Sequence, residues 1–298
     1  MTPVTALRDL RISFEFFPPK TPEMEVNLWR AITRLQPLAP SFVCVTYGAG
    51  GSTRERTHAT VRRLLDETSL LPAAHLTCVG ATRAEVDAVA AEYWAIGVRH
   101  IVALRGDPPV EGGAYVPHPG GYAYGVDLVA GLRRVAPFEI TVPAFPETHP
   151  EAPNAAFDLD NLKRKVDAGA TRAITQFFFD NGVYFRFLDR CLAAGITIPI
   201  IPGIMPVSNF TQMRHFAEKA GAWVPSWLGR HFEGLEHDAE TRKLVAATVA
   251  AEQVQDLFDR GVRDLHFYTL NRADLSYAIC HLLGVRPEPA LLPAGAAT

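Results

Sequence analysis

A repeated unit of helix, glycine and strand is the sequence feature that most limits the folds open to this chain. Four segments carry it, AIGVRHIVAL, DAGATRAITQ, AAGITIPIIP and DRGVRDLHFY. In each, a glycine follows an amphipathic stretch and precedes an apolar, β-branched run, which is where a left-handed residue ends a helix. The four glycines are Gly97, Gly169, Gly195 and Gly261. Repeated units of this kind build parallel sheets.

The number of these units predicts the architecture. Between the predicted strands, apolar residues recur at helical spacing, as in residues 84–96, where one face carries Val86, Val89, Tyr93 and Ile96. A single (β/α)8 (TIM) barrel fits eight strands better than a doubly wound sheet, for which about five to seven are usual. No Pro/Gly/Ser-rich linker divides the chain, so we expect one domain over residues 1–298. The predicted strands are residues 12–17, 42–47, 74–79, 100–104, 139–144, 172–177, 196–202 and 264–269.

Two segments depart from the simple repeat. Residues 107–125 form a long Pro/Gly-rich stretch after the fourth strand, on the side of a barrel where active sites are built, and could act as a lid. Residues 209–262 are long enough for extra helices between the seventh and eighth strands. The barrel is therefore expected to carry additions at both places.

Composition favours a small-molecule partner. The formal net charge is −3, with 29 basic and 32 acidic residues, which gives no general attraction to nucleic acid or to an anionic membrane. No run of about 18 apolar residues and no secretory signal pattern occurs, so a cytoplasmic location is expected. The scattered cysteines predict buried free thiols rather than disulfides or a metal site. Sequence leaves the oligomeric state open, including a homo-oligomer.

Polar residues recur two apart on or just after the predicted strands. Because alternate strand residues face the inside of a barrel, a barrel that served only as a core would carry Val, Ile and Leu there. The pattern predicts a wide polar ligand cavity. The residues concerned are Ser13 and Glu15, Cys44 and Thr46, His75 and Thr77, Arg105 and Asp107, His266 and Tyr268, and Gln176 alone.

Two carboxylates are candidates for chemistry. Glu15 lies in SFEFFPP among three phenylalanines, and a carboxyl group removed from water holds its proton more readily, which suits a proton donor. A buried ion pair with a barrel arginine is the alternative. Asp107 in ALRGDPP directly follows a strand, and could instead be a turn residue before the prolines.

Two segments could bind an anion. GAGGST, residues 48–53, would suit an anion on backbone N–H groups, although such a turn needs no ligand. NLKRK, residues 161–165, could reach a pyrophosphate or be a solvated helix face. No strand ends in lysine and no H-x-H, G-x-S-x-G, P-loop or G-x-G-x-x-G motif follows a strand. A nicotinamide or flavin would therefore have to bind at the barrel mouth.

Several long motifs, in order, resemble methylenetetrahydrofolate reductases of the bacterial type that have only the catalytic domain. They include SFEFFPPKT, FVCVTYGAGGSTRERT, HIVALRGDPP, NLKRKVDAGATRAITQFFFD and LHFYTLNRADLSYAICHLLGVRP, and the match spans nearly the whole chain. The resemblance implies a (β/α)8 barrel with non-covalent FAD. It also implies hydride transfer from NADH or NADPH through N5 of the flavin to 5,10-methylenetetrahydrofolate, a step of one-carbon metabolism that supplies methionine biosynthesis.

The resemblance also assigns roles to residues. Glu15 is implied to protonate N10 of the folate, and Asp107 to lie near the flavin and bind the pterin. Thr46 is implied on the nicotinamide side, and the substrate-side positions are Gln176, Gln212, Phe216, Tyr268 and Arg272. The implied FAD contacts are Tyr47, Ala49, His75, Arg105, Gly106, Tyr124, His149, Ala152, Asp158, Asn161, Arg164 and Lys165.

Some features leave alternatives. Phe145 stands where a tyrosine is common in the family, and residues 108–121 are longer than in many bacterial relatives, which leaves the electron donor the least certain element. Two other functions remain compatible with the residues. One is a flavin-free lyase or isomerase acting on a phosphorylated metabolite, with Glu15 as base; the other is a folate or flavin carrier without turnover. Regulation by adenosylmethionine is not expected.

Overall fold

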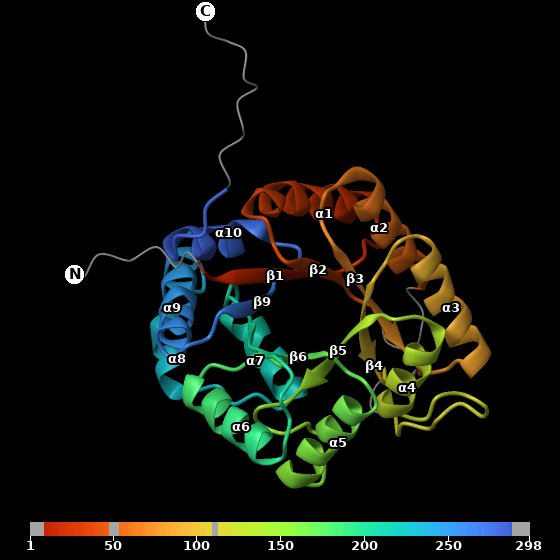
Figure 1. The fold of residues 1–298 in the computed structure, drawn as a ribbon. Helices are drawn as coiled ribbons and strands as arrows, with labels where there is room; N and C mark the ends of the chain where they lie inside the picture. The colour runs from red at the N-terminus through yellow and green to blue at the C-terminus, as the bar shows by residue number, and fades with distance from the viewer. Residues whose placement is uncertain (1–8, 48–53, 109–112, 288–298) are drawn as a thin grey trace, which may run out of the picture.

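The computed structural model describes residues 9–47, 54–108 and 113–287, and its strands form one parallel barrel surrounded by helices (Figure 1). Hydrogen-bonded neighbours follow the order β7-β6-β5-β4-β3-β2-β1-β9-β8. The predicted (β/α)8 fold is confirmed. The strands are β1 (Arg11–Phe16), β2 (Phe42–Val45), β3 (Pro72–Thr77), β4 (His100–Leu104), β5 (Glu139–Ala144), β6 (Arg172–Thr175), β7 (Ile200–Ile201), β8 (Gly203–Ile204) and β9 (Asp264–Tyr268).

The seventh strand of the barrel is broken where the sequence predicted a continuous run over residues 196–202. Its two halves, β7 and β8, flank Pro202, which has no N–H to donate to a neighbouring strand. The first half pairs with β6 and the second with β9, and the His266 amide donates to the Pro202 carbonyl. The broken strand thus closes the barrel by joining a different neighbour on each side of the proline.

The helices alternate with the strands as the repeat predicted. Gly97, Gly169, Gly195 and Gly261 have φ values of +100°, +115°, +70° and +100°, so each is the left-handed residue that follows a helix. The helices are α1 (Pro22–Leu35), η1 (Gln36–Leu38), α2 (Arg54–Glu67), α3 (Arg83–Ala95), α4 (Gly125–Val135), α5 (Ala155–Asp167), α6 (Asn181–Ala193), α7 (Phe210–Ala220), α8 (Ser226–Phe232), α9 (Ala239–Asp259) and α10 (Ala273–Leu282).

The apolar residues divide into an outer and an inner core. The outer core fills the space between strands and helices and includes the predicted face of α3, with Val86, Val89 and Tyr93 buried and Ile96 packed against them. The inner core lies inside the barrel and contains Phe42, Cys44, Ala73, Val102, Ile174 and Ile201. The four cysteines are free and buried, as predicted. The inner core is small because polar residues occupy the rest of the barrel interior.

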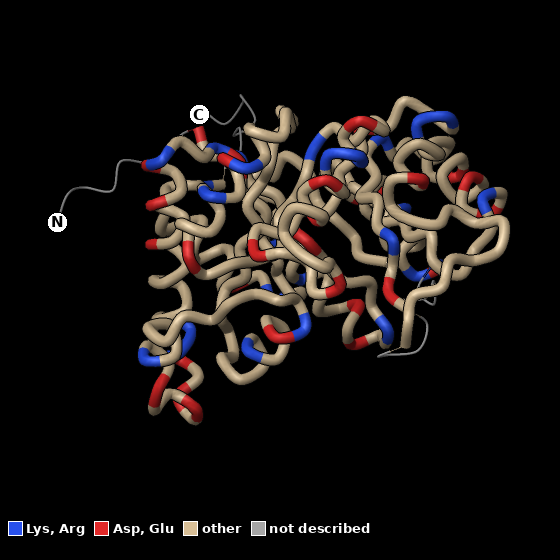
Figure 2. The backbone as a smooth tube through the Cα atoms, turned by 90° about the horizontal axis from the view of Figure 1, so that it is seen from below, with Lys and Arg blue, Asp and Glu red and all other residues tan. Residues whose placement is uncertain are grey.

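The insertion between the last two barrel strands is helical, as expected, and comprises α7, α8 and α9. In the described part of the chain, no helix has both the length and the apolar character needed to cross a membrane. Basic and acidic residues are both distributed along the backbone, as seen from below in Figure 2.

Candidate active site

A large cavity opens at the ends of the strands β1 and β9, which carry Glu15 and Tyr268, and of β6, which Gln176 directly follows. Its volume is about 2640 Å³, whereas a pocket for one small ligand usually measures about 300–1,000 Å³. It lies at the carboxyl ends of the barrel strands, the face on which active sites of this fold are built. The cavity therefore has room for a large cofactor together with a second molecule.

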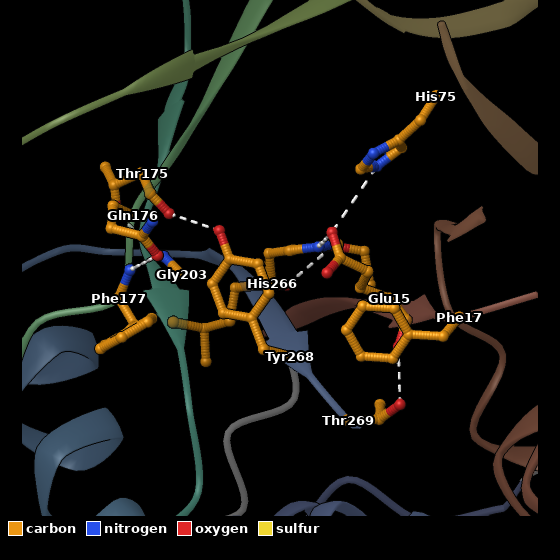
Figure 3. A network of polar contacts seen from close by, with 12 residues as sticks. Glu15, Phe17, His75, Thr175, Gln176, Phe177, Gly203, His266, Tyr268 and Thr269 are labelled. Carbon is orange, nitrogen blue, oxygen red and sulfur yellow. Dashed lines mark hydrogen bonds and ion pairs between the residues drawn. The ribbon is translucent and has the colours of Figure 1, made fainter. Parts of the chain in front are cut away.

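Glu15 lies at the inner end of this cavity between two histidines (Figure 3). Its Oε2 atom is 3.6 Å from Nε2 of His75 and 3.9 Å from Nε2 of His266. Phe14 and Phe16, its neighbours in sequence, belong to the outer core instead. The expected surrounding of phenylalanines is therefore wrong for these two residues, because successive strand residues face opposite sides, whereas Phe17 lines the same cavity as Glu15. Among the described residues, its ion-pair neighbours are histidines, not the arginine of the alternative interpretation.

Both histidines are buried. Burial lowers the pKa of His75 to about 4, against the opposing effect of nearby Glu15. His266 is fully buried, and its Nδ1 atom lies 2.8 Å from the Ser13 hydroxyl oxygen on the adjacent strand. Neither Nε2 atom has a hydrogen-bond partner in the described part of the chain. Glu15 thus faces imidazole nitrogens that are unsatisfied within the protein.

Tyr268 and Gln176 form the wall beside Glu15 (Figure 3). The Tyr268 hydroxyl donates to the Thr175 backbone carbonyl at 2.7 Å, and the side-chain Oε1 of Gln176 accepts from the Phe177 backbone amide at 3.0 Å. The Thr175 hydroxyl in turn accepts from the Gly203 amide at 2.9 Å. These bonds tie the last residues of β6 to β8 and β9, and they hold both side chains at the cavity surface.

The chain turns sharply after β4. The inward positions of β4 are His100, Val102 and Leu104, so the predicted polar pair of Arg105 and Asp107 comes just after the strand. Arg105, Gly106 and exposed Asp107 line the cavity beyond the strand end. Gly106 has φ +89°, and a Cβ there would lie 2.4 Å from Cγ1 of Val79. A glycine is therefore required for the backbone to form this part of the wall.

An ion pair spans the mouth next to this turn. Nη1 of Arg105 donates to Glu151 at 2.6 Å, and this hydrogen bond lowers the pKa of Glu151. The guanidinium also lies 4.4 Å from the ring centre of Tyr115, which comes from the long segment after β4. The Tyr115 hydroxyl donates to the Ala123 carbonyl at 2.7 Å. That segment therefore reaches the cavity, although its residues 109–112 lie outside the described part of the chain.

Helix α5 places the NLKRK basic pair in the cavity wall beside the turn at Arg105. Lys165 is buried, and burial lowers the pKa of its ammonium to about 8. Arg164 is half-exposed and pairs with Asp160 one turn earlier at 3.0 Å. The His149 amide donates to Asp158 at 2.9 Å, which fixes the loop before the helix. The wall therefore offers one buried and one partly solvated cation to an anion in the cavity.

Most of the predicted site residues meet at this cavity. Gln212 does not: it is exposed in the first turn of α7, and its backbone N–H donates to Oδ1 of the cap residue Asn209. Ala49 and the rest of residues 48–53 lie outside the described residues. The predicted residues that line the cavity are Glu15, Thr46, Tyr47, His75, Arg105, Gly106, Asp107, Tyr124, His149, Ala152, Asp158, Asn161, Arg164, Lys165, Gln176, Phe216, Tyr268 and Arg272.

Sequence reasoning missed other lining residues. Tyr115 and Phe157 present aromatic rings at the cavity, and Phe157 is 50% exposed in the first turn of α5. An exposed aromatic residue next to a basic helix segment is a signal that could have drawn attention to it. Glu151 was missed because an acidic residue in a loop has no distinctive pattern. His266 was predicted to face inward but was given no role.

Comparison with known proteins identifies the family. Residues 4–284 match the family model described as methylenetetrahydrofolate reductase. The chain is 57% identical over 279 residues to the 5,10-methylenetetrahydrofolate reductase of Salmonella typhimurium, covering 93% of this chain and 92% of that protein. It is 56% identical to the Escherichia coli protein of the same name, with the same coverage. The chain belongs to the methylenetetrahydrofolate reductase family. Membership makes it an oxidoreductase.

More distant matches agree with this family and fold. An Arabidopsis thaliana protein named methylenetetrahydrofolate reductase (NADH) 1 is 34% identical over 296 residues, which are 96% of this chain and 50% of that protein. A Clostridium thermocellum structure that binds two copies of 5-methyl-5,6,7,8-tetrahydrofolic acid superimposes with a TM-score of 0.58 at 15% identity, covering 92% of this chain and 94% of that one. At that identity, the superposition shows the shared barrel only.

Proposed function

We propose that the chain reduces 5,10-methylenetetrahydrofolate to 5-methyltetrahydrofolate, with FAD as cofactor and NADH or NADPH as electron donor. Family membership over nearly the whole chain gives the reaction class. The observation that carries the proposal is the position of Glu15, which is the carboxylate at the inner end of a cavity large enough for two ligands. A reaction that needs a flavin, a substrate and one proton donor fits this arrangement.

The cavity walls fit FAD. A pyrophosphate is bound by cationic side chains and by backbone N–H groups that can approach it closely. The wall provides the cations of Lys165 and Arg164, and the turn at Gly106, where any side chain would collide with Val79. Burial removes the Lys165 ammonium from water, and its lowered pKa indicates that the charged form is disfavoured there. A bound anion would offset this loss of hydration. Asp158 and Asn161, on the same helix, add polar groups for the ribityl or ribose hydroxyls. The exposed Phe157 ring supplies an apolar surface beside them.

When bound, FAD supplies a carrier that accepts hydride from a nicotinamide and gives it to the folate. The protein itself supplies the proton that the folate step needs. Glu15 gives its proton to N10 of the folate, the bond between N10 and the bridging methylene carbon breaks, and the carbon becomes an iminium ion able to accept hydride. The carboxylate that remains is 13% exposed at its side chain and regains a proton from cavity water.

The other walls would orient the substrate. Phe216 and Tyr268 present rings for stacking, and Gln176 presents an amide group for the edge of the pterin or the nicotinamide. Arg272, at the start of α10, offers a cation for the carboxylates at the far end of the folate, with Nη1 held at 3.1 Å from the Ser208 hydroxyl. Asp107 lies on the other side of the mouth, where a carboxylate can accept hydrogen bonds from the pterin amino group.

Flavin absorbance tests the proposal directly. The purified protein should be yellow; NADH or NADPH added without oxygen should bleach it, and methylenetetrahydrofolate should then restore the colour. A colourless protein that turns over without flavin would favour the lyase or isomerase. A yellow protein that binds folate but neither bleaches nor recovers would favour the carrier. Either result would overturn the proposed reaction.

A further inference from the structure

The turn that follows β9 is bonded to the end of β1 next to Glu15 (Figure 3). The Thr269 hydroxyl donates to the backbone carbonyl of Glu15 at 2.6 Å. The side chain of Asn271 pairs with the backbone of Phe17: its Oδ1 accepts from the Phe17 N–H and its Nδ2 donates to the Phe17 carbonyl, both at 2.9 Å. The proposed reaction gives neither Thr269 nor Asn271 a role.

The backbone of this turn is uncommon. Leu270 and Asn271 have φ values of +51° and +56°, in the left-handed region, which is unusual for leucine and better tolerated by asparagine. The Thr269 hydroxyl accepts from the Asn271 N–H at 3.1 Å, and because it has one proton, it gives that proton to the Glu15 carbonyl. The Arg272 N–H donates to the Thr269 carbonyl at 2.8 Å. Strained backbone held by such bonds is typical of functional sites.

The bonds from the turn reach β1 at its carboxyl end. Pro18 and Pro19 come directly after Phe17, and neither has an N–H to donate to a neighbouring strand. On the other side of β1, the Thr46 N–H donates to the Phe16 carbonyl at 2.9 Å. The end of β1 is therefore held between the residue that follows β2 and the turn that follows β9.

Glu15 depends on these backbone bonds because its own side chain makes no hydrogen bond in the described part of the chain. Its Oε2 atom is 3.6 Å from His75 and 3.9 Å from His266, which is too far for a hydrogen bond. The place of the carboxyl group is thus set by the backbone of β1. Thr269 is only 4% exposed and is not among the residues that line the cavity. It can therefore affect a ligand only through the residues that it holds.

We propose that Thr269 and Asn271 are positioning residues that fix the end of β1, and with it the Glu15 carboxyl, within reach of the folate. Proton transfer needs the donor atom within hydrogen-bond distance of the acceptor, and a displacement of about 1 Å can slow a reaction about 10²-fold. Thr269 holds Glu15 directly, and Asn271 holds the peptide that follows. The inference rests on the proposed function, which assigns the proton to Glu15.

Thr269→Val tests the direct bond, because valine keeps the shape of the side chain and lacks the hydroxyl. Reoxidation of reduced flavin by saturating methylenetetrahydrofolate should slow about 10- to 100-fold, the effect of a small displacement. Flavin reduction by NADH needs no proton from Glu15 and should keep its rate. Thr269→Ser, which retains the hydroxyl, should restore reoxidation. Asn271→Gly, which permits the left-handed backbone but loses both bonds to Phe17, should also slow reoxidation.

A double variant separates positioning from general damage to the barrel. If Thr269 acts through Glu15, Thr269→Val should slow reoxidation little further in the Glu15→Gln background, where the carboxyl proton is already absent. Equal slowing in both backgrounds would overturn the proposal. Slowing that disappears at saturating folate would also overturn it, because the turn would then act on folate affinity through Arg272.

A second hydroxyl bonded to the same strand supplies the matched control. At the amino end of β1, the Ser41 hydroxyl donates to the Ile12 carbonyl at 3.0 Å. Ser41→Ala should leave reoxidation unchanged, although it removes a hydroxyl–carbonyl bond of the same kind. Equal slowing in Ser41→Ala and Thr269→Val, or normal reoxidation in Thr269→Val, would remove the positioning role alone. Reduced wild-type flavin that the folate does not reoxidise would contradict the proposed function itself, and the positioning role with it.

Discussion

Tyr268 lies directly against Gly203 in the structure. A Cβ atom built on Gly203 would be 2.5 Å from Cε2 of the Tyr268 ring and 2.3 Å from the Thr175 carbonyl oxygen. The same carbonyl accepts the Tyr268 hydroxyl proton. The absence of a side chain at Gly203 thus allows the Tyr268 ring to pack over the broken strand and its hydroxyl to reach the Thr175 carbonyl.

Replacing Gly203 with alanine should therefore disturb both the barrel and the site. We expect Gly203→Ala to lower the free energy of unfolding by about 1–3 kcal/mol, the usual cost of adding a group to a packed core. Thermal unfolding monitored by circular dichroism measures it. Because the contact involves the Tyr268 ring, the double variant with Tyr268→Ala should lose less than the two single losses added together. Strict additivity would contradict this explanation.

The barrel could be predicted because its signals are local. Gly97, Gly169, Gly195 and Gly261 mark helix ends where only the left-handed conformation continues the chain, and period-two and period-3.6 patterns distinguish strands from helices. The break at Pro202 could not, because IPIIPG reads as one apolar run. The division of this strand into β7 and β8 is seen only in the structure, where each half pairs with a different strand.

The same reasoning explains the site predictions. Strand alternation brought Glu15, His75 and His266 together correctly, because all three lie within regular strands. Arg105 lines the cavity as predicted, but alternation is not the reason, because the chain leaves β4 there and turns at Gly106 with positive φ. Gln212 is one helical turn from Phe216, which does line the cavity, and only the tertiary position of α7 shows that the first turn lies outside it.

Lys165 should matter more for FAD retention than Arg164. The ammonium of Lys165 is buried in the cavity wall, whereas Arg164 is 48% exposed and already paired with Asp160. A charge-assisted hydrogen bond contributes about 1.5–3 kcal/mol, and an exposed, paired cation contributes less. Lys165→Ala should lose most of its flavin on extensive dialysis and Arg164→Ala only part, with both variants folded. Absorbance per mole of protein measures the loss, and equal retention would contradict this ranking.

FAD binding should also depend on pH through Lys165. Burial lowers the pKa of its ammonium to about 8 in the free protein, and a bound pyrophosphate would raise it again. The ammonium is thus present below about pH 8 and is lost from the free protein above it. FAD affinity should be constant below pH 8 and fall by up to about tenfold per pH unit above it. Fluorescence titration with FAD between pH 6.5 and 9.5, roughly one and a half units to either side of that pKa, measures the profile.

The matched control keeps a cation that does not titrate. A guanidinium stays protonated over this range, so Lys165→Arg should bind FAD with little dependence on pH even if its affinity is lower. In Lys165→Met the affinity should be weak at every pH. A wild-type profile that stays flat through pH 9, or a slope that persists in Lys165→Arg, would assign the dependence to another group.

Glu15→Gln should separate the two half-reactions. Glutamine keeps the size and polarity of the side chain but cannot give a carboxyl proton, and only the folate step needs one. General acid catalysis contributes about 10²- to 10⁴-fold, so reoxidation of reduced flavin by methylenetetrahydrofolate should slow by that factor. Reduction of the flavin by NADH should stay within a few-fold of the wild type. Rapid-mixing absorbance of the flavin follows each step separately.

A purely structural role for Glu15 predicts a different outcome. If its contacts with His75 and His266 served mainly to hold the barrel, removing the carboxylate would lower the melting temperature and slow both half-reactions together. The distances of 3.6 and 3.9 Å are too long for strong hydrogen bonds, and His75 is neutral at pH 7 because burial lowers its pKa to about 4. Little stability therefore depends on the charge of Glu15. Folate-dependent reoxidation at the wild-type rate in Glu15→Gln would show that another group gives the proton.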